Sequence, residues 1–377
     1  MVFKNLIYLT YQVFPNEKAN NLQTIKMLEN FSKQKIDSTL IFPDRGKFNK
    51  EPDLIFNFYN VKKHFRIKTF KHFLPFNYFS KFEKFNFLVS SFLWSFFSVN
   101  KISKSINNFD VLMTRTHWVL YFLSRLNNRI VYECHKYSKI ENFIFRRLSK
   151  KKNIILIFSN NNLMAKYKIS GDLAKNSLIL ESSFEEIQFN SNFRKNSKQV
   201  VFVGSLLRFN KPRNIEFLIN IFANKMLKDY RLLIIGGPDN TKIELEKKIH
   251  SNNVKFLGQL SHQDSLQIIQ ESEIGILINS NDEHSELHTS PIKYFEYLRG
   301  GLKILAVDFL AHRNLPMGEN NYYFKNNDSE DFIKKLRIAT SNRFKHNREI
   351  ENYSYESRVK KIINQVARLE GFEPPTF

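Results

Sequence analysis

The sequence predicts an α/β protein made of two Rossmann-like domains, and three observations lead to this expectation. Short apolar segments alternate with segments of helical character, as in parallel sheets that helices cover on both faces. A polar, aperiodic stretch over Phe184–Ser197 divides this alternation into two series of similar length. The 377 residues are also too many for one ordinary core. We expect domains over residues 1–190 and 198–350 that face each other across a cleft. Because ligands bind at the carboxyl ends of parallel strands, we expect the ligand site in this cleft.

The first series opens with a βαβ unit, whose helix over Ala19–Gln34 carries apolar or aromatic residues at Ile25, Met27, Leu28 and Phe31. The expected strands of this series are Asn5–Thr10, Ser38–Phe42, Val111–Thr114, Ile130–Glu133, Ile154–Ser159 and Ser177–Leu180.

The second series follows the polar connection and repeats the same alternation. Its expected strands are Gln199–Gly204, Tyr230–Gly236, Val254–Leu257, Ile274–Asn279 and Lys303–Val307. Its expected helices are Ile215–Ala223, Ile243–His250, Ser265–Glu271 and Pro291–Leu298.

The chain is strongly basic, with a formal net charge of +22. Residues 1–150 hold 25 Lys and Arg against 10 Asp and Glu, so most of the excess lies in the first half. A charge of this size attracts nucleic acid, anionic lipid or phosphorylated substrates. No nucleic-acid-binding module is recognisable, so nucleic acid is not an expected partner, whereas an anionic membrane surface stays open.

The single cysteine, Cys134, excludes an intrachain disulfide and favours a reducing compartment. Asn5 and the polar residues from Gln12 onward interrupt the first apolar stretch too early for a signal peptide. We expect a cytoplasmic protein, with peripheral association at the inner face of a membrane as an added option.

The apolar run Phe85–Val99, bounded by Lys84 and Lys101, has two interpretations. It is shorter than the roughly 20 residues of a spanning helix, so one interpretation is a buried helix. The other is a helix that lies on a membrane surface, which the basic flanks and Trp94 favour. The two are compatible.

No P-loop, GxGxxG, HExxH or CxxC motif and no D-x-D pair occurs in the sequence. We therefore expect neither a carboxylate-bound metal ion nor a bound cofactor.

The most informative segment is Thr289–Asp308. Ser290 suits the N-cap and Pro291 the first position of a helix, while Gly300 suits its end. A helix start offers unpaired N–H groups and a positive dipole end, which together suit a phosphate. Glu296, further along among aromatic residues, can accept paired hydrogen bonds from a ribose diol.

At this point the sequence resembles the GT-B glycosyltransferases, in particular the retaining family 4 within glycosyl transferases group 1. Its signature, close to S-P-x-K-x-x-E-Y-x-x-x-G, is matched in register by Ser290, Pro291, Lys293, Glu296 and Tyr297, with Gly300 and Gly301 at the closing glycine. Further blocks occur in the expected order: Val201–Gly204 followed by Lys211, Leu232–Gly237, Val254–Gly258 and Ile274–Asn279.

The first half carries two blocks of the same family. Phe14-Pro15, with Asn20 and Gln23 after it, resembles the family's opening. Tyr132-Glu133-x-His135 resembles its Y-E-x-H block, whose histidine faces the reaction centre. The resemblance extends from about Ile7 to Asp308.

The chain departs from the family pattern at two positions. The family often carries a glutamate eight residues before Glu296, where this chain has His288. An arginine commonly follows the glycine at Gly204, where this chain has Ser205, and Arg208 is the candidate to replace it because a guanidinium binds two phosphate oxygens at once.

The resemblance implies a sugar transfer from a UDP- or GDP-sugar to a saccharide or lipid-linked acceptor, with retention of configuration and without a metal, as in the synthesis of cell-surface polysaccharides or glycoconjugates. The implied catalytic residues are His135, Lys211 and Glu296. The donor would contact Gly204, Ser205, Arg208, Lys211, His288, Ser290, Pro291, Ile292 and Glu296. The acceptor side would include Asn20, Asn21 and Glu133.

The resemblance also implies that the final helix, Tyr355–Leu369 within residues 351–370, returns to the first domain. Residues 371–377 are expected to be a disordered tail without a role.

Other interpretations remain for these residues and for the whole chain. Lys211 can be a solvated loop lysine, His135 a structural histidine, and Asn20 and Asn21 caps of the first helix. The chain as a whole can be a catalytically inactive protein of this fold or a basic protein that binds polyanions. Another activity on the same fold, such as a phosphorylase or an epimerase, is a third option.

Overall fold

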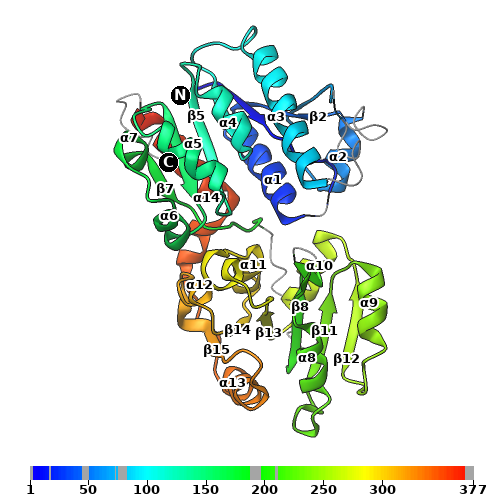
Figure 1. The fold of residues 1–377 in the computed structure, drawn as a ribbon. Coiled ribbons are helices and arrows are strands. Elements are labelled where there is room, and N and C mark those ends of the chain that lie inside the picture. Colours follow the sequence, from blue (N-terminus) through cyan, green and yellow to red (C-terminus); the bar gives the residue numbers. More distant parts are fainter. Residues whose placement is uncertain are drawn as a thin grey trace. The chain divides into compact units, whose positions relative to one another are not determined.

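The computed structural model describes residues 3–16, 18–44, 51–72, 74, 83–186, 197–208 and 211–369. The chain divides into two compact units, the first made of residues 1–181 with 355–377 and the second of residues 182–354. Each unit holds one parallel sheet with helices packed on both of its faces (Figure 1). The predicted α/β class with two Rossmann-like domains is confirmed.

The sheet of unit 1 has the strand order β3-β2-β1-β4-β5-β6-β7, and every neighbouring pair is parallel. Its strands are β1 (Asn5–Leu9), β2 (Asp37–Pro43), β3 (Arg66–Phe70), β4 (Val111–Thr114), β5 (Arg129–Cys134), β6 (Ile154–Phe158) and β7 (Ser177–Ile179). The helices are α1 (Ala19–Lys33), α2 (Pro52–Phe58), α3 (Glu83–Ile102), α4 (His117–Leu123), α5 (Lys139–Arg147), α6 (Asn161–Tyr167), α7 (Gly171–Lys175) and α14 (Tyr355–Leu369).

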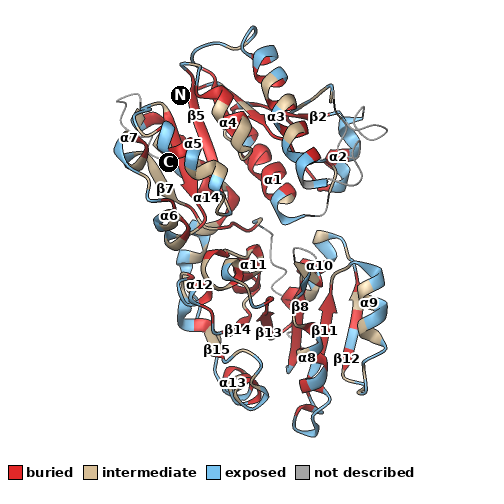
Figure 2. Cartoon of the chain, viewed as in Figure 1, coloured by how far each residue is buried: buried red, intermediate tan, exposed pale blue. Residues whose placement is uncertain are grey.

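The inner strands β4, β5 and β6 of unit 1 are buried along their whole length, so they consist mainly of apolar residues (Figure 2). The edge strands β3 and β7 are only partly buried. Alternate residues separate into two cores: Tyr8 and Met113 pack with helices α1 and α14, whereas Leu9 and Leu112 pack with α3, α4 and α5. Since side chains alternate along a strand, one sheet needs helices on both faces.

Unit 2 repeats this architecture with the strand order β12-β11-β8-β13-β14-β15, again all parallel. Its strands are β8 (Gln199–Val203), β11 (Arg231–Ile235), β12 (Val254–Gly258), β13 (Ile274–Leu277), β14 (Lys303–Val307) and β15 (Asn321–Phe324), with the small pair β9 (Leu207–Arg208) and β10 (Lys211–Pro212) beside them. The helices are α8 (Ile215–Phe222), α9 (Asp239–Glu246), α10 (His262–Glu271), α11 (Ile292–Arg299), α12 (Leu310–Arg313) and α13 (Ser329–Ser341), with short turns of helix η1 (Lys225–Leu227), η2 (His284–His288), η3 (Gly318–Asn320) and η4 (Arg348–Tyr353).

The helix expected over Ile243–His250 lies earlier in the chain, as α9 over Asp239–Glu246. None of its residues is buried, so no apolar stripe marks its position in the sequence. Helix α10 likewise begins three residues before the expected Ser265, because the Ser261 hydroxyl caps it by accepting from the Asp264 N–H.

The chain passes from one core to the other earlier than expected. Leu180 belongs to the core around α1 and α14, while Phe184 is already buried in a core of unit 2. The connection predicted over Phe184–Ser197 therefore begins before Phe184, and residues 187–196 lie outside the described part of the chain. So does the tail at 371–377.

Helix α14 belongs to unit 1, where Val359, Ile362 and Val366 pack in the same core as α1. Arg358 anchors it: its guanidinium lies 2.8 Å from Glu133 Oε1 and donates to the carbonyls of Leu180 and Glu181. Arg358 and Glu133 are both almost fully buried, at 2% and 1% exposure. A buried ion pair is tolerated when hydrogen bonds satisfy most of the remaining polar atoms. Here both terminal nitrogens of Arg358 are bonded, and Nε has no partner among the described residues.

Replacing Arg358 by Ala is expected to lower the free energy of unfolding by about 3–5 kcal/mol, because it leaves the Glu133 carboxylate buried without its partner. The measurement is urea denaturation at neutral pH. Lys360→Ala, which removes the exposed ion pair of Lys360 with Glu356 on the same helix, is the control and should cost less than about 1 kcal/mol. Equal losses in the two variants would contradict the assignment of Arg358 as the anchor.

Candidate functional site

The strand order of unit 2 defines a switch point at the carboxyl ends of β8 and β13. The helix after β8, α8, packs on one face of the sheet, whereas α11, which comes after β13, packs on the other. The loops that leave the two strands therefore diverge, and such a point is where sheets of this type bind ligands. The loop after β8 holds Gly204 to Arg208, and the loop after β13 leads to Thr289 and Ser290.

Glycines bring the neighbouring loops close together at this sheet edge. A side chain at Gly236, after β11, would meet the Gly204 carbonyl oxygen at 1.8 Å, so no other residue fits. A side chain at Gly204 would meet Nη1 of Arg213 at 2.9 Å. The Arg213 guanidinium thus lies directly over the bare backbone that ends β8.

Three cationic residues gather around this loop. The antiparallel pair β9–β10 sets Lys211 opposite Arg208, and Lys211 is exposed. The Arg213 N–H donates to the Leu206 carbonyl, which holds the start of the next segment against the loop. Arg208 Nη2 lies 3.4 Å from the Thr289 hydroxyl, so this guanidinium reaches the segment just before α11.

The charges of this cation cluster, Arg208, Lys211 and Arg213, are only partly balanced. Burial and, to a lesser extent, the like charge of Arg208 lower the pKa of Arg213 to about 10. Burial also lowers the pKa of Arg208, while Asp282 acts in the opposite direction. Arg213 Nε has no hydrogen-bond partner among the described residues. Two neighbouring guanidinium groups with one carboxylate near them favour an anionic ligand.

His312 lies near the same cluster and is completely buried. Burial lowers its pKa to about 4, and Arg208 contributes to this shift. Nδ1 lies 2.8 Å from the Val307 carbonyl oxygen, so it carries the proton, and Nε2 has no partner among the described residues. A neutral imidazole acceptor therefore adjoins the cations.

The segment Ser290 to Ile292 differs from the expected capping arrangement. The residue that caps α11 is Pro291, without a side-chain hydrogen bond, and the helix begins at Ile292. Ser290 does not cap the helix, because its hydroxyl accepts from the Ser182 N–H at 3.0 Å. Without a side-chain cap, the first N–H groups of α11 keep their capacity to bind an anion.

Glu296 lies on α11 as expected but is occupied on both oxygens. Oε2 is 2.5 Å from Lys293 Nζ, and Oε1 is 2.9 Å from His262 Nε2. Burial alone would raise the pKa of Glu296, but Lys293 and then His262 hold it at about 2, so the buried group is a carboxylate. His262 also approaches Glu185, with Nδ1 at 3.7 Å from Oε2.

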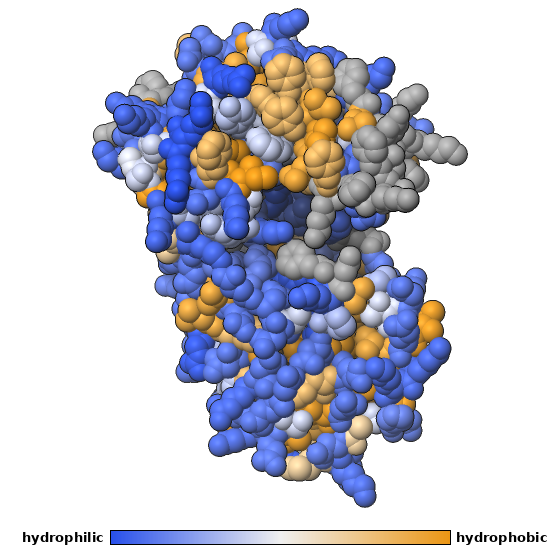
Figure 3. All heavy atoms as spheres, in the orientation of Figure 1, coloured by the Kyte–Doolittle hydropathy of each residue, from blue (hydrophilic) through white to orange (hydrophobic). Residues whose placement is uncertain are grey.

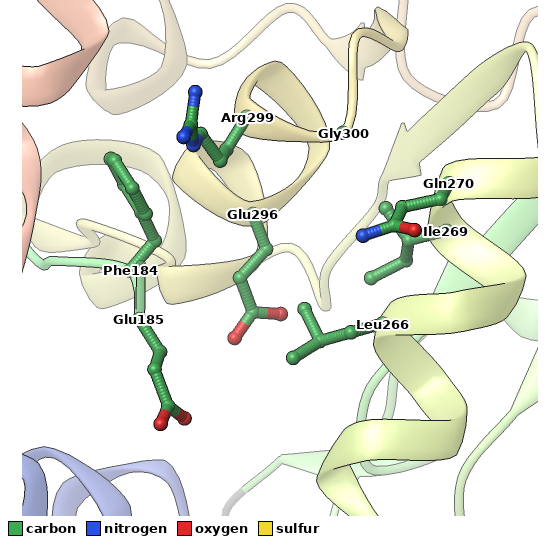
Figure 4. Close-up of a pocket in the computed structure, with 8 residues that line it drawn as sticks. All are labelled: Phe184, Glu185, Leu266, Ile269, Gln270, Glu296, Arg299 and Gly300. Atoms are coloured by element: carbon green, nitrogen blue, oxygen red, sulfur yellow. The ribbon is translucent and has the colours of Figure 1, made fainter. Parts of the chain in front are cut away.

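A small pocket adjoins Glu296 within unit 2. Figure 4 shows the Glu296 and Glu185 carboxylates pointing the same way from two different segments, with the apolar side chains of Leu266 and Ile269 beside Glu296. Its lining residues are Phe184, Glu185, Leu266, Ile269, Gln270, Glu296, Arg299 and Gly300.

The two positions that depart from the family pattern differ in exposure. His288 ends the π-helical turn η2 and is buried, at 4% exposure. Ser205 is exposed, and its hydroxyl accepts from the Leu207 N–H at 3.3 Å. Ser205 therefore contributes no charge, while Arg208 and Arg213 supply it from farther along the loop.

In unit 1, Glu133, which the resemblance places on the acceptor side, is 1% exposed and bound by side chains of the same unit. The pKa of Glu133, which burial would raise, is held at about 2, chiefly by Arg358. Tyr8 also donates to its carboxylate. His135 follows β5, is partly buried and lies close enough for its charge to act on Glu133.

Neither Asn20 nor Asn21 caps α1, because the capping residue is Lys18 and makes no side-chain hydrogen bond. Asn21 is 2% exposed, and its amide donates to the Val13 carbonyl. Asn20 is exposed, and its backbone carbonyl accepts from Arg115 at 2.8 Å. Of the two, only Asn20 is open to a ligand.

Sequence reasoning missed three residues of the site in unit 2. Arg213 lies two positions after Lys211, and the basic run around it was the available signal. His262 carried no signal, because its partner Glu296 lies 34 residues away. His312 carried none either, because its bond to the Val307 carbonyl and its place near Arg208 depend on how α12 packs.

The described residues contain no group of three or more His, Cys, Asp or Glu side chains that could hold a metal ion. Within the same residues, no helix combines the length and apolarity that crossing a bilayer demands.

Solved structures share this fold over nearly the whole chain. A glycosyltransferase from Rickettsia africae is similar with a TM-score of 0.65 at 14% identity, covering 97% of this chain and 99% of that one. The pneumococcal O-GlcNAc transferase GtfA, in complex with UDP and GlcNAc, gives 0.68 at 11% identity, covering 98% and 99%. Both likenesses concern the fold, which is the GT-B fold.

Residues 197–342 match the family described as Glycosyl transferases group 1. This span lies within unit 2 and includes the cation cluster and Glu296. The resemblance to glycosyl transferases group 1 drawn from the Ser290–Gly301 signature is thus confirmed for this span of unit 2, and the narrower family 4 stays a prediction.

One curated sequence matches a larger part of the chain. A DNA-directed RNA polymerase subunit beta' from Oedogonium cardiacum is 26% identical over 324 residues, or 74% of this chain. The chain spans only 16% of the length of that protein.

The depressed pKa of Glu296 gives a prediction for acid stability. Its shift from an ordinary 4.5 to about 2 stabilises the folded state above about pH 4.5, and this contribution is lost as the pH falls toward 2. The unfolding free energy of the wild type relative to Glu296→Gln should therefore shrink by up to about 3 kcal/mol over that window.

Urea denaturation from about pH 6 down to about pH 3 measures this difference. The exposed Glu244→Gln is the control and should show no comparable pH-dependent gap. A gap for Glu296→Gln that stays constant with pH would show that the carboxylate is not held ionised by its partners.

Proposed function

We propose that the chain is a retaining glycosyltransferase that takes a sugar from a UDP- or GDP-sugar and transfers it to a saccharide or lipid-linked acceptor. We place this activity in the synthesis of cell-surface polysaccharides or glycoconjugates. The observation that carries the proposal is the cation cluster at the switch point of a group 1 glycosyl transferase domain, beside the open start of α11.

The proposed chemistry is the stabilisation of the leaving diphosphate. As the bond between sugar and phosphate breaks, negative charge develops on the phosphate oxygens. Lys211, Arg208 and Arg213, with the N–H groups at the start of α11, would neutralise that charge. No metal ion is required by this scheme, because the cations come from the chain itself.

The proposed role of Glu296 is to hold the ribose. A carboxylate has about four lone-pair sites, and Lys293 and His262 use only part of this capacity. Their contacts also fix the orientation of the carboxylate, so two ribose hydroxyl groups can donate to it without a rearrangement. His288, Gly204 and Ser205 are the remaining chain positions that we propose near the donor.

For unit 1 we propose binding of the acceptor. His135 follows strand β5 and is the group that can hold or move a proton there. Asn20, at the exposed start of α1, would bind an acceptor hydroxyl. The GtfA structure, with UDP and GlcNAc bound to the same fold, supports this division only by analogy.

Arg213→Leu is expected to weaken UDP or GDP binding by roughly tenfold to a hundredfold, the loss of one charge-assisted hydrogen bond. Without nucleotide the same variant should be at least as stable as the wild type, because it removes a like charge next to Arg208. Calorimetric titration and thermal unfolding measure the two quantities.

The control for this prediction is Arg337→Leu at an exposed position of α13, which should leave both quantities unchanged. Unaltered nucleotide affinity in Arg213→Leu would remove Arg213 from the donor site.

The activity itself is tested by thermal shift and turnover with a set of UDP- and GDP-sugars, since a ligand that binds the folded state raises its Tm. Lys211→Ala should lower turnover by about a hundredfold or more, because it removes transition-state charge stabilisation. If no nucleotide sugar binds or reacts while polyanion binding persists in Lys211→Ala and Glu296→Gln, the chain is a polyanion-binding protein and the proposal is wrong.

A further inference from the structure

Helix α3 packs with its polar side toward the protein. Five residues that are small or polar are buried to 2% exposure or less: Asn86, Ser90, Ser91, Ser95 and Ser98. Their hydrogen bonds stay local, as where Ser95 donates to the Ser91 carbonyl one turn earlier. The apolar residues that α3 buries are Trp94, at 1% exposure, and, in its last turn, Val99 and Ile102, each at 3%. An ordinary surface helix has the opposite arrangement.

The outer side of α3 is correspondingly apolar. The exposed apolar residues of α3 are Phe85 at 63%, Phe87 at 40%, Leu88 at 37%, Phe92 at 38% and Phe97 at 45%. Phe87 also packs on the buried Tyr11, and Glu83, Asn100 and Lys101 are exposed at the two ends of the helix. Figure 3 shows apolar side chains gathered over α3 on this face of unit 1. Single exposed apolar residues are common, but four exposed phenylalanines on one helix mark an interaction surface.

Helix α4 extends this apolar surface. Phe92 contacts the rings of Trp118 and Phe122, with centroids 5.0 and 5.2 Å apart, and Phe96 contacts Phe122 at 5.4 Å. Arg125 lies over the rings of Tyr121 and Phe122 at 5.3 and 5.2 Å. The α3–α4 face, defined as the outer sides of these two helices, thus has a cation at its edge.

Apart from Glu83, the exposed first residue of α3, the exposed charges on and next to the α3–α4 face are basic. Between Glu83 and Asp110 the sequence has no acidic residue, and between Asp110 and Glu133 it again has none. Asp110 is buried and accepts from Asn5. Lys101, Lys104 and Arg125 are exposed on or after these two helices.

We propose that the α3–α4 face docks on the surface of an anionic lipid bilayer. Phenylalanine rings with a tryptophan beside them enter the region between headgroups and acyl chains, while basic residues at the edge bind the headgroups. A protein partner would need no such one-sided charge, whereas an anionic membrane does. The proposal goes beyond sugar transfer, and either can fail without the other.

The test is co-sedimentation of the full chain with vesicles of phosphatidylcholine alone or with about one third phosphatidylglycerol. The wild type should bind the anionic vesicles strongly, the neutral ones weakly, and lose binding as salt is added. Phe85→Ser/Phe97→Ser should lower binding by at least about tenfold, since two exposed rings no longer enter the lipid.

A second variant, Lys101→Glu/Arg125→Glu, tests the electrostatic part and should lower binding by more than about twentyfold, at about fivefold for each basic residue lost. The control is Met226→Ser/Ile243→Ser, two comparably exposed apolar residues of unit 2 at 51% and 52%. Both test variants change exposed side chains, so thermal unfolding should match that of the wild type.

Three results would overturn the proposal. The first is equal binding of the wild type to neutral and anionic vesicles, and the second is equal binding by the control and both test variants. The third is a dimer in sedimentation velocity that Phe85→Ser/Phe97→Ser dissociates while vesicle binding stays absent, which would assign the α3–α4 face to a second copy of the chain.

Discussion

The buried guanidinium of Arg358 joins three parts of unit 1 that lie far apart in the sequence. Arg358 is a residue of helix α14. It binds Glu133 near the end of β5 and donates to the carbonyls of Leu180 and Glu181, where the chain leaves the unit. Taking two charges out of water is costly, and only several simultaneous hydrogen bonds offset that cost. The strand end that leads to His135 is thereby held in place, so the proposed acceptor side depends on an ion pair that never touches an acceptor.

Unit 2 shows the opposite electrostatic arrangement. Burial lowers the pKa of both Arg208 and Arg213, and the charge of Arg208 adds to the lowering for Arg213, while Asp282 raises the pKa of Arg208. Burying two neighbouring cations lowers the stability of the free protein, and a bound anion offsets this cost by balancing their charge. Glu296 differs, because Lys293 and His262 already balance it. The proposed donor site thus combines a cation cluster that an anionic ligand would neutralise with a carboxylate, Glu296, that is already balanced and can accept hydrogen bonds from hydroxyl groups.

Helix α3 buries several serines and exposes phenylalanines, which is the reverse of the usual distribution between core and surface. On the buried side of α3, most residues are serines, and Trp94 is the buried aromatic residue. The phenylalanines then remain outside, where water makes each of them unfavourable. Exposed phenylalanines become favourable when the apolar region of a lipid bilayer covers them. In the proposed docking, the basic residues beside them favour a bilayer with anionic headgroups.

The sequence by itself determined the alternation of strands and helices, the two sheets and the signature around Glu296, because these depend on local periodicity and on residue types at fixed spacing. Only the tertiary structure decided which polar groups meet. It paired Glu133 with Arg358 across 225 positions, took Ser290 away from the helix cap to bind Ser182, and set Arg213 over Gly204. Which polar side chains pair in this way depends on how sheets and loops pack in three dimensions. No local pattern in the sequence shows that two such residues are close in space.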